Sequence, residues 1–355
     1  MKKTYDDFTK KIFEKVSSTE ENVVVSPLSV LLLLGIAADA VKGDSREEIL
    51  KALDGCSYED FRNKLCELQS VFSVSETLVS SNAVCIKEEL STTITPGYEE
   101  KLADYDGRLF ATKDIVRSVN EWVNEKTRGM ISEIADESMN QMLACLMNAI
   151  AFEAEWDKQY EEDDIHEDEF TDADGKKSDI WMLESVEHSY IENDSFTGFI
   201  KPYKDREYSF MALLPKNPAD MEQALSDVDF AKMYSEAFYC KVYASIPEFK
   251  YDYSKELTAI LMDMGIRTVF TPQADFSPMS SEWLRIDSIL HKAHIDLDRK
   301  GTKAAAVTMA FLTLGCAPMM ERSENVRLDR PFLYAIMHNE SGLPVFTGIM
   351  NKAQK

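Results

Sequence analysis

The sequence has no excess of basic residues. Its 355 residues include 39 Lys and Arg against 63 Asp and Glu, which gives a formal net charge of −24. Phosphate backbones and anionic membrane surfaces would both repel such a surface. The sequence also contains no segment that is long enough and apolar enough to span a bilayer. We therefore predict that neither nucleic acid nor a membrane is a partner, whereas basic partners are compatible with the charge.

Cysteine is sparse, and none of it is arranged as a metal or redox motif. The six cysteines form no CxxC pair and have no zinc-ligand spacing, so we interpret them mostly as free thiols. The acidic run 161–174 lacks the glycine and the ligand order of a calcium-binding loop, and we interpret it as a solvated segment. We predict no metal and no other cofactor. The cysteines are Cys56, Cys66, Cys85, Cys145, Cys240 and Cys316.

The sequence also lacks the pattern of a signal peptide and an obvious linker. Residues 1–16 are basic but contain Asp6 and Asp7 and no continuous apolar stretch, which predicts an amphipathic helix rather than a secretory leader. A hydrophobic content of 45% is enough for a large core. Because no segment resembles a linker, we predict a single domain over residues 1–355.

What the sequence does contain is an unusual stretch from Gly301 to Pro318, GTKAAAVTMAFLTLGCAP. No proline occurs from Thr302 to Gly315, so every residue there can donate a backbone N–H to a sheet. With the two-residue period of a strand, one face is small and nearly uncharged, whereas the other begins with Lys303. The pattern predicts a strand held outside a sheet that it could enter. An alanine-rich helix is the alternative, because Ala, Leu and Met are good helix formers. The small face consists of Thr302, Ala304, Ala306, Thr308, Ala310 and Leu312.

The segment GTKAAAVT resembles the reactive-loop hinge of the serpins, and motifs of that family recur in family order along essentially the whole chain. The run LMNAIAFEAEW at 146–156 is similar to a strand of the family's main sheet, and His291 begins an H-K-A motif. The ending resembles the family's R-P-F block through Phe346 and Gly348. Two further blocks match NxxxSPxS through Asn22, Ser26, Pro27 and Ser29, and N-x-W-V-x-x-x-T-x-G-x-I through Asn120, Trp122, Val123, Thr127, Gly129 and Ile131.

The resemblance implies an α+β serpin fold. Such a fold has a large central, mostly antiparallel sheet with further sheets, about eight or nine helices, and an exposed reactive-centre loop, here at about 299–328. Hydrophobic periodicity and turn residues agree with several elements of this fold. We predict a strand at 23–25, a core helix at 28–40, strands at 78–86 and 142–152, a helix at 114–134, and two C-terminal strands joined by a turn at 339–342.

The resemblance further implies an inhibitor of serine proteases rather than an enzyme. A protease would attack the loop, form an acyl-enzyme and be trapped when the cleaved loop enters the main sheet. Counting from the hinge glycine places the scissile bond at Gly315-Cys316, with Leu314-Gly315 and Cys316-Ala317 as alternatives. These small or apolar residues suit elastase-like or chymotrypsin-like proteases. The family role suggests a monomer that acts outside the cell. The implied hinge residues are Gly301, Thr302, Ala304, Ala305, Ala306 and Thr308.

The same resemblance assigns a group of residues to the place where the main sheet opens. Asn148 would lie in mid-strand beneath the sheet, and Trp156 would lie at the end where the loop enters. An asparagine in a buried strand needs hydrogen-bond partners for both amide groups. We therefore expect Asn148 to form a hydrogen-bonded cluster with Ser26 or Ser29 and with His291.

Two features depart from the family pattern. Arg299 and Lys300 stand where serpins usually have two acidic residues, and Lys303 replaces the usual acid after the hinge threonine. The salt bridge expected at the base of the loop is therefore absent or reversed. Val307 stands where a small residue is usual, but it lies on the outward face, so its cost should be small.

Two other functions compete with protease inhibition. A non-inhibitory member of the same fold would act as a binding or chaperone-like protein, and the basic residues before the hinge make this conceivable. An enzyme would need Cys316 as its nucleophile with one of the five histidines, but a cysteine in a loop lacks a fixed base. A covalent, SDS-resistant complex with a serine protease is expected only from the inhibitor.

Overall fold

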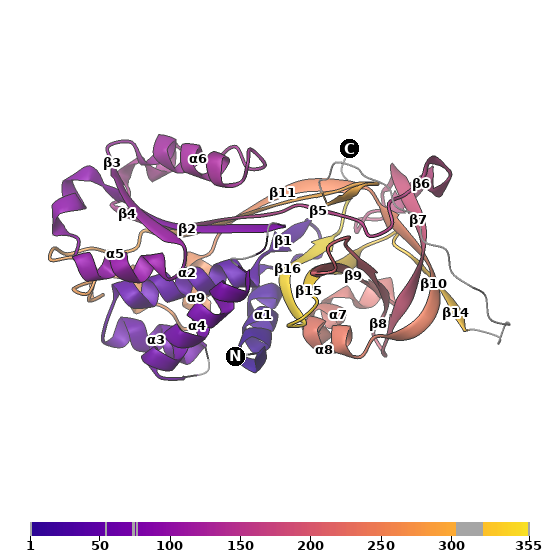
Figure 1. Cartoon of the computed structure of the whole chain (residues 1–355), viewed down its shortest axis with the longest axis horizontal. Helices are drawn as coiled ribbons and strands as arrows, with labels where there is room; N and C mark the ends of the chain where they lie inside the picture. The colour runs from indigo at the N-terminus through magenta and orange to yellow at the C-terminus, as the bar shows by residue number, and fades with distance from the viewer. Residues whose placement is uncertain (1, 54, 73–74, 76, 303–321, 354–355) are drawn as a thin grey trace.

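The computed structural model of the chain describes residues 2–53, 55–72, 75, 77–302 and 322–353. Figure 1 shows an elongated molecule in which long strands run from a helix-rich end toward a second group of strands at the opposite end. The described residues include α-helices α1 to α9 and two sheets, so the predicted α+β architecture is confirmed.

The helices of the first third pack beneath one face of the long strands. α2 (Pro27–Ala40) is buried over its whole length, as expected for a helix that is apolar nearly all round. It begins where the Ser26 hydroxyl accepts a hydrogen bond from the Ser29 N–H, with Pro27 in the first turn. Around it lie α1 (Lys2–Val16), α3 (Asp44–Ala52), α4 (Tyr58–Phe72) and α5 (Pro96–Ala103).

The first sheet contains the strands that surround the predicted hinge. Its strand order is β3-β2-β4-β12-β13-β5, and β11 pairs with the other edge of β12, from Leu290 to Leu297. Figure 1 shows α2 and α9 (Thr258–Asp263) below these strands and α6 above them. The strands are β2 (Leu78–Lys87), β3 (Gly107–Thr112), β4 (Ala144–Phe152), β5 (Ala154–Glu155), β11 (Phe249–Glu256), β12 (Ser288–Leu297) and β13 (Gly301–Thr302).

Helix α6 (Ile115–Lys126) is shorter than the predicted helix at 114–134, and that prediction is wrong at its C-terminal end. Gly129 has a φ of 80°, a left-handed conformation that ends helices. The following segment is held by Asn120, whose Oδ1 accepts hydrogen bonds from the N–H groups of Ile134 and Ala135 at 2.8 and 2.9 Å. The hydrophobic pattern past Gly129 therefore belongs to an extended segment that packs on α6 and the sheet rather than to another helical turn.

The second sheet has the order β1-β16-β15-β9-β8-β7-β10-β14, and β6 pairs with β7. The predicted strand Val23–Val25 is β1, and the two predicted C-terminal strands are β15 and β16, so these predictions are confirmed. The remaining helices are α7 (Met221–Asp227) and α8 (Phe230–Ser235). The strands are β6 (Ile165–Thr171), β7 (Lys177–Glu192), β8 (Phe196–Pro202), β9 (Tyr208–Pro215), β10 (Phe238–Pro247), β14 (Ser323–Arg327), β15 (Phe332–His338) and β16 (Leu343–Met350).

The two sheets hold opposite ends of the predicted loop. β13 belongs to the first sheet and β14 to the second, and residues 303–321 connect them. Among the described residues, no helix is long and apolar enough to cross a membrane, and no group of His, Cys, Asp and Glu has the arrangement of a metal site. The five cysteines in the described ranges are free thiols.

Candidate functional site

In the first sheet, β4 and β12 pair directly at one end, whereas β13 lies between β12 and β5 at the other end. We call this second region, where β13 separates the strands, the opening. β4 and β12 pair in parallel from Cys145 opposite Ser288 to Ala149 opposite Lys292. Further along, β13 lies between β12 and β5 and is antiparallel to both, with Thr302 opposite Leu297 on one side and Ala154 on the other. The partners on the two sides are 143 positions apart in both places, 291 with 148 and 297 with 154, so the two regions share one register.

Thr302 is already inside the sheet. The sequence predicted a strand outside the sheet from Thr302 onward, and the structure corrects this, because the side chain is only 2% exposed. Its hydroxyl lies 2.8 Å from the hydroxyl of Tyr203. Gly301 precedes it, and a Cβ added there would lie 2.1 Å from the carbonyl oxygen of Ala154, so only glycine permits this approach of two backbones.

Trp156 contacts both Tyr203 and the turn before β13. Its ring stacks on Tyr203 with centroids 4.6 Å apart and planes 5° from parallel. The indole Nε1 donates a hydrogen bond to the carbonyl of Asp298 at 3.0 Å, and the Trp156 N–H donates to the carbonyl of Lys300 at 3.0 Å. Trp156 therefore holds both the turn before β13 and the ring that contacts Thr302.

A buried ion pair lies beside the same ring. The Lys201 ammonium lies 2.9 Å from Glu187 Oε1, with side chains 2% and 10% exposed. The same ammonium lies 5.3 Å from the centroid of Trp156 and 4.5 Å from that of Tyr160. The Lys201 ammonium is therefore buried but not unpaired, because the Glu187 carboxylate and the faces of two aromatic rings surround it.

The ion pair at the base of the loop is reversed relative to the family pattern. Arg299 lies before the hinge, and its Nε and Nη2 donate to the two carboxylate oxygens of Glu248 at 3.0 and 3.3 Å. The Arg299 N–H also donates to Glu248 Oε1 at 3.1 Å. The sequence left open whether the salt bridge at the base of the loop is absent or reversed. It is reversed, because the basic partner, Arg299, lies beside the hinge and the acidic partner, Glu248, directly follows β10.

The predicted sheet-opening residues meet only in part. Ser26 and His291 are both fully buried, and the Ser26 N–H donates to His291 Nε2 at 3.2 Å. Asn148 lies directly opposite His291 in the β4–β12 ladder, but its amide donates to Ser80 and Asn82 of β2, at 3.2 and 2.9 Å. The expected direct bond between Asn148 and the serines of α2 is therefore replaced by bonds within the sheet.

Two complementary groups in this cluster have no hydrogen-bond partner among the described residues: Asn148 Oδ1 and His291 Nδ1. Burial lowers the pKa of His291 to about 4, so the ring is neutral at pH 7. Because Nε2 accepts a hydrogen bond, the proton of the neutral ring belongs on Nδ1. One acceptor and one donor therefore stand unpaired on neighbouring strands, on the face that packs against the core.

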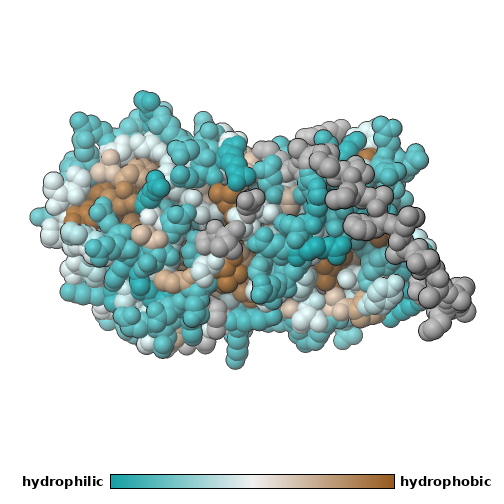
Figure 2. All heavy atoms as spheres, viewed as in Figure 1, coloured by the Kyte–Doolittle hydropathy of each residue, from teal (hydrophilic) through white to brown (hydrophobic). Residues whose placement is uncertain are grey.

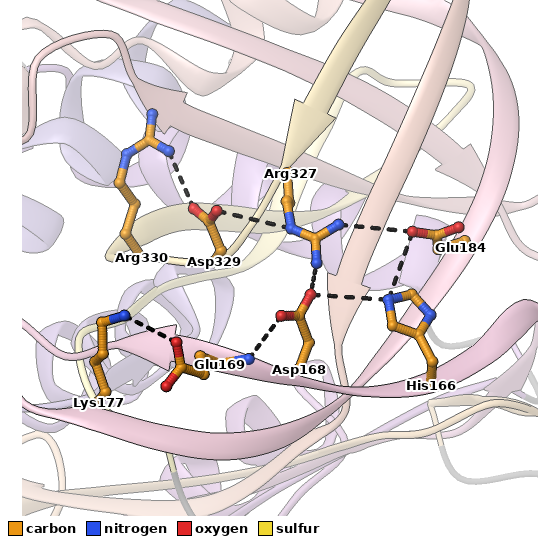
Figure 3. A network of polar contacts seen from close by, with 8 residues as sticks. All are labelled: His166, Asp168, Glu169, Lys177, Glu184, Arg327, Asp329 and Arg330. Carbon is orange, nitrogen blue, oxygen red and sulfur yellow. Dashed lines mark hydrogen bonds and ion pairs between the residues drawn. The ribbon is translucent and has the colours of Figure 1, made fainter.

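The C-terminal end of the loop is held by a network of charges on the second sheet (Figure 3). Arg327 of β14 lies between Asp168 of β6 and Glu184 of β7; it contacts Asp168 directly and lies 3.6 Å from Glu184. Asp329 lies 3.7 Å from the same guanidinium, and His166 is within 3.7 Å of both Asp168 and Glu184.

Arg322 adds a second anchor at the start of this segment. Its Nη2 lies 2.6 Å from Glu192 and its Nε 2.7 Å from Glu324. β14 then pairs with β10 over five residues, from Ser323 to Arg327.

The remaining predicted site residues lie outside the described residues. These are the hinge residues Ala304, Ala305, Ala306 and Thr308, and the scissile-bond candidates Leu314, Gly315, Cys316 and Ala317. Lys303 and Val307 fall in the same range.

Sequence reasoning missed several residues of the opening. Tyr203 and Glu248 lie far from Thr302 and Arg299 in sequence, and no local pattern signals either pairing. Ser80, Ser81 and Asn82 gave a usable signal, because a polar run within a largely buried strand indicates hydrogen-bond partners, and the two-residue period places Ser80 and Asn82 on one face.

Comparison with known proteins agrees with the motifs. The family model described as Serpin (serine protease inhibitor) matches residues 3–353. An uncharacterized serpin-like protein of Thermococcus kodakarensis is 29% identical over 97% of this chain and 84% of its own length. Leukocyte elastase inhibitor of Equus caballus is 26% identical over 92% of each chain.

A solved structure shares the fold closely. The crystal structure of the thermophilic serpin tengpin in its native state matches with a TM-score of 0.89 and 33% identity, over 98% of this chain and 93% of that one. The similarity thus extends over both sheets and not only over the hinge motif.

Proposed function

This chain belongs to the serpin family, and we propose that it is a suicide-substrate inhibitor of serine proteases that acts as a monomer outside the cell. In this proposal a protease attacks the loop and forms an acyl-enzyme. The cleaved loop then continues into the first sheet and carries the protease with it. Insertion of a serpin's loop into its own sheet is a standard example of strand addition.

The position of Thr302 is the observation that carries the proposal. Thr302 belongs to β13, which lies between β12 and β5 and is antiparallel to both. Further along the sheet, β12 and β4 pair directly in a parallel ladder. Parallel pairing is slightly weaker per residue than antiparallel pairing. An inserted strand would replace one parallel ladder with two antiparallel ones, and about a dozen new hydrogen bonds at roughly 1 kcal/mol each give on the order of 10 kcal/mol.

The shared register predicts where the inserted residues would arrive. Each further residue of the loop would meet the preceding residue of β12 and of β4, so Thr308 would reach His291 on one side and Asn148 on the other. Directly opposed residues share a face of the sheet. The Thr308 hydroxyl would accept a hydrogen bond from His291 Nδ1–H and donate one to Asn148 Oδ1, two of the buried groups that have no partner in the described ranges.

We propose Gly315-Cys316 as the scissile bond and elastase-like or chymotrypsin-like enzymes as targets, because Leu314 to Ala317 are small or apolar. Insertion from Thr302 to this bond would move the acylated end by about 45 Å at 3.3 Å per residue. A displacement of that size is comparable with the diameter of the molecule, so the active site of the attached protease can be distorted before deacylation.

The test is incubation of the protein with chymotrypsin, with an elastase and with trypsin. The proposal expects an SDS-resistant covalent complex with one or both of the first two, and mass spectrometry of the released C-terminal peptide should locate the new terminus within Gly315 to Ala317. It also expects that protein nicked in the loop by a non-target protease melts at a higher temperature than intact protein. Cleavage without a covalent complex and without a rise in melting temperature would identify a non-inhibitory serpin instead.

A further inference from the structure

Exposed hydrophobic side chains gather on two strands of the second sheet. In the described ranges, seven large hydrophobic side chains are exposed, and five of them lie on β7 and β10. Trp181 lies near the start of β7, and the other four are Val186, Phe238, Tyr239 and Tyr243. Tyr239 is 69% exposed and Tyr243 45%. The broad face of the molecule in Figure 2 is instead mainly hydrophilic, as expected for a chain of this charge. Clustering of this kind marks interaction sites more often than single exposed residues do.

We call the surface of these four side chains the aromatic surface. Tyr239 lies opposite Ser189 in the ladder, and it is connected to the others through its contact with His188, which lies between Val186 and Tyr190 on the same face of β7. Val186 lies directly opposite Tyr243 in the β7–β10 ladder, and Phe238 opposite Tyr190. Direct cross-strand neighbours share a face of the sheet. A β-bulge in β10 lies between Tyr239 and Val242, and the ring of Tyr239 stacks on His188.

The rings of the aromatic surface are held in place before any partner binds. Tyr239 and His188 stack with centroids 5.7 Å apart and planes 5° from parallel. Phe238 packs edge to face on Tyr190 at 5.5 Å, and the Lys241 ammonium lies 4.8 Å from the centroid of Tyr243. Rigid aromatic side chains lose little entropy on binding and dominate the energetics of many interfaces.

The aromatic surface is continuous with the C-terminal end of the loop. Arg322 is the first described residue after 321, and its guanidinium lies 5.6 Å from the centroid of Phe238 and 5.5 Å from that of Tyr190. Asn325 of β14 lies opposite Tyr243. Charged side chains border the hydrophobic centre, among them Glu184 and Arg327 of the network in Figure 3. A hydrophobic centre with a charged border is the anatomy of a protein–protein interface.

Chain length brings a bound protease to this surface. Cys316 and Arg322 are six positions apart in sequence, a distance of at most ~22 Å for a fully extended chain. A protease domain of about 230 residues has a radius of gyration of roughly 17 Å. A protease of that size that holds the Gly315-Cys316 bond is therefore close enough to touch the aromatic surface.

We infer that the aromatic surface docks the same serine protease that cleaves the loop. This inference rests on the proposed function. Because the aromatic surface lies on the C-terminal side of the bond, it would meet the protease beside the part of the active-site cleft that binds the residues after the cut. The matching surface of the protease is apolar. The acyl-enzyme must leave this contact when the loop inserts, so docking raises the rate of the encounter without adding stability to the trapped complex.

The test is a double variant, Tyr239→Ser with Tyr243→Ser. Both side chains are exposed, so the fold should tolerate the change. The control is Trp283→Ser, which removes an aromatic residue that is 51% exposed. Trp283 is three residues after Ser280, which forms a bridge with Ile94 just before α5. Figure 1 shows α5 and β14 at opposite ends of the molecule.

The measurement is the second-order rate constant for reaction of the loop with chymotrypsin and with an elastase, counted as inhibition plus cleavage. We expect the double variant to react about tenfold more slowly with at least one of them, the size of loss typical of two interface tyrosines. The number of inhibitor molecules consumed per protease inactivated should not change, and the control should match the parent.

The design separates the two proposals. If the parent is cleaved but never traps a protease, inhibition is wrong, whereas a tenfold slower cleavage of the double variant still supports docking. Equal rates for parent and double variant, or no reaction of the parent with either protease, overturn the docking surface. A parent that sediments as a dimer and a double variant that sediments as a monomer, with equal rates, would assign the aromatic surface to a second copy of the chain instead.

Discussion

The two ends of the loop are held in opposite ways. On the N-terminal side, the hinge consists of Gly301 and Thr302 in a two-residue strand, preceded by the ion pair of Arg299 with Glu248. On the C-terminal side, a five-residue strand is fixed by ion pairs of Arg322 and Arg327. The hinge side ends at a parallel ladder that a new strand could separate, whereas the C-terminal side continues into β14, which pairs with β10 at the edge of the other sheet.

This difference teaches that the loop is built to move from one end only. A strand that enters the first sheet can extend from Thr302 without a change of register. The C-terminal segment would have to break several charged contacts and a ladder to move at all. Under the proposed function, the C-terminal end would keep an intact loop from inserting, and cleavage would remove that restraint.

The strongest way to break this asymmetry is to block the hinge. Because Thr302 is already buried in the intact protein, Thr302→Arg should drive this residue out of the sheet and lower the melting temperature of the intact protein. We also expect it to convert the inhibitor into a substrate, because insertion after cleavage would have to bury the guanidinium again without a partner, at a cost of several kcal/mol. The number of inhibitor molecules consumed per protease inactivated should rise at least about tenfold. Lys303→Arg is the control and should behave as the parent, because the two-residue period of the sequence predicts that Lys303 faces outward. Efficient trapping by Thr302→Arg would show that Thr302 does not lead the insertion.

Acid should weaken the hinge side through His291. Its pKa is lowered by burial from 6.5 to about 4, so the unfolded chain binds the proton first as the pH falls. The stability that depends on a neutral ring is complete above pH 6.5 and is lost progressively down to pH 4, by about 3 kcal/mol in total.

Chemical denaturation of the intact protein between pH 7 and pH 4 measures this loss. His291→Gln should show a shallower decrease of the unfolding free energy over the same interval, whatever its stability at pH 7. Parallel curves for the two proteins would contradict a neutral, buried His291.

A third variant tests how the hinge side is stabilised after the loop has been cleaved. Thr308→Val removes the hydroxyl that we expect between His291 and Asn148, and it should lower the stability of the cleaved form by about 2 kcal/mol, because a buried donor and acceptor stay unpaired. Thr308→Ser keeps the hydroxyl and serves as the control. The measurement is the difference in melting temperature between intact and nicked protein. If valine and serine give the same difference, the predicted register of the inserted strand is wrong.

The smallest expected effect concerns the reversed ion pair. Arg299→Glu places two carboxylates together at the base of the loop and should cost about 1 kcal/mol, since both partners are partly exposed. The double variant Arg299→Glu with Glu248→Arg should recover most of the melting temperature.

Arg327→Gln, on the other side of the loop, should lower the melting temperature without changing the number of inhibitor molecules consumed per protease. A change of that number by Arg327→Gln would refute the asymmetry.

Much of the hinge side could be predicted from sequence, because its signals are local. The glycine, the absence of proline and the alternation of small residues are properties of neighbouring positions, and they predict a strand that begins at Gly301 and Thr302, where the structure has β13. The burial of Thr302 in the intact chain could not be predicted, since it depends on the space that Gly301 leaves beside Ala154.

The partners of the site were harder to predict, because they depend on which strands become neighbours. Glu248 is 51 positions from Arg299, and Tyr203 is 99 positions from Thr302. The register of β4 on β2 decides that Asn148 bonds Asn82 and Ser80 rather than Ser26. Helix α6 ends early for a local reason, the left-handed Gly129, but hydrophobic spacing alone does not reveal that conformation.

The pairing of β1 with β16 has a consequence for the time at which the molecule can be completed. Val23 lies opposite Ile349, so the partners are 326 positions apart in sequence. A ribosome that adds about 5–20 residues per second needs on the order of half a minute between them. During that interval β1 has no strand to pair with, and the hinge is synthesised before β15 and β16 exist. The second sheet is therefore completed only after the hinge has emerged, and its last step is a slow, long-range pairing.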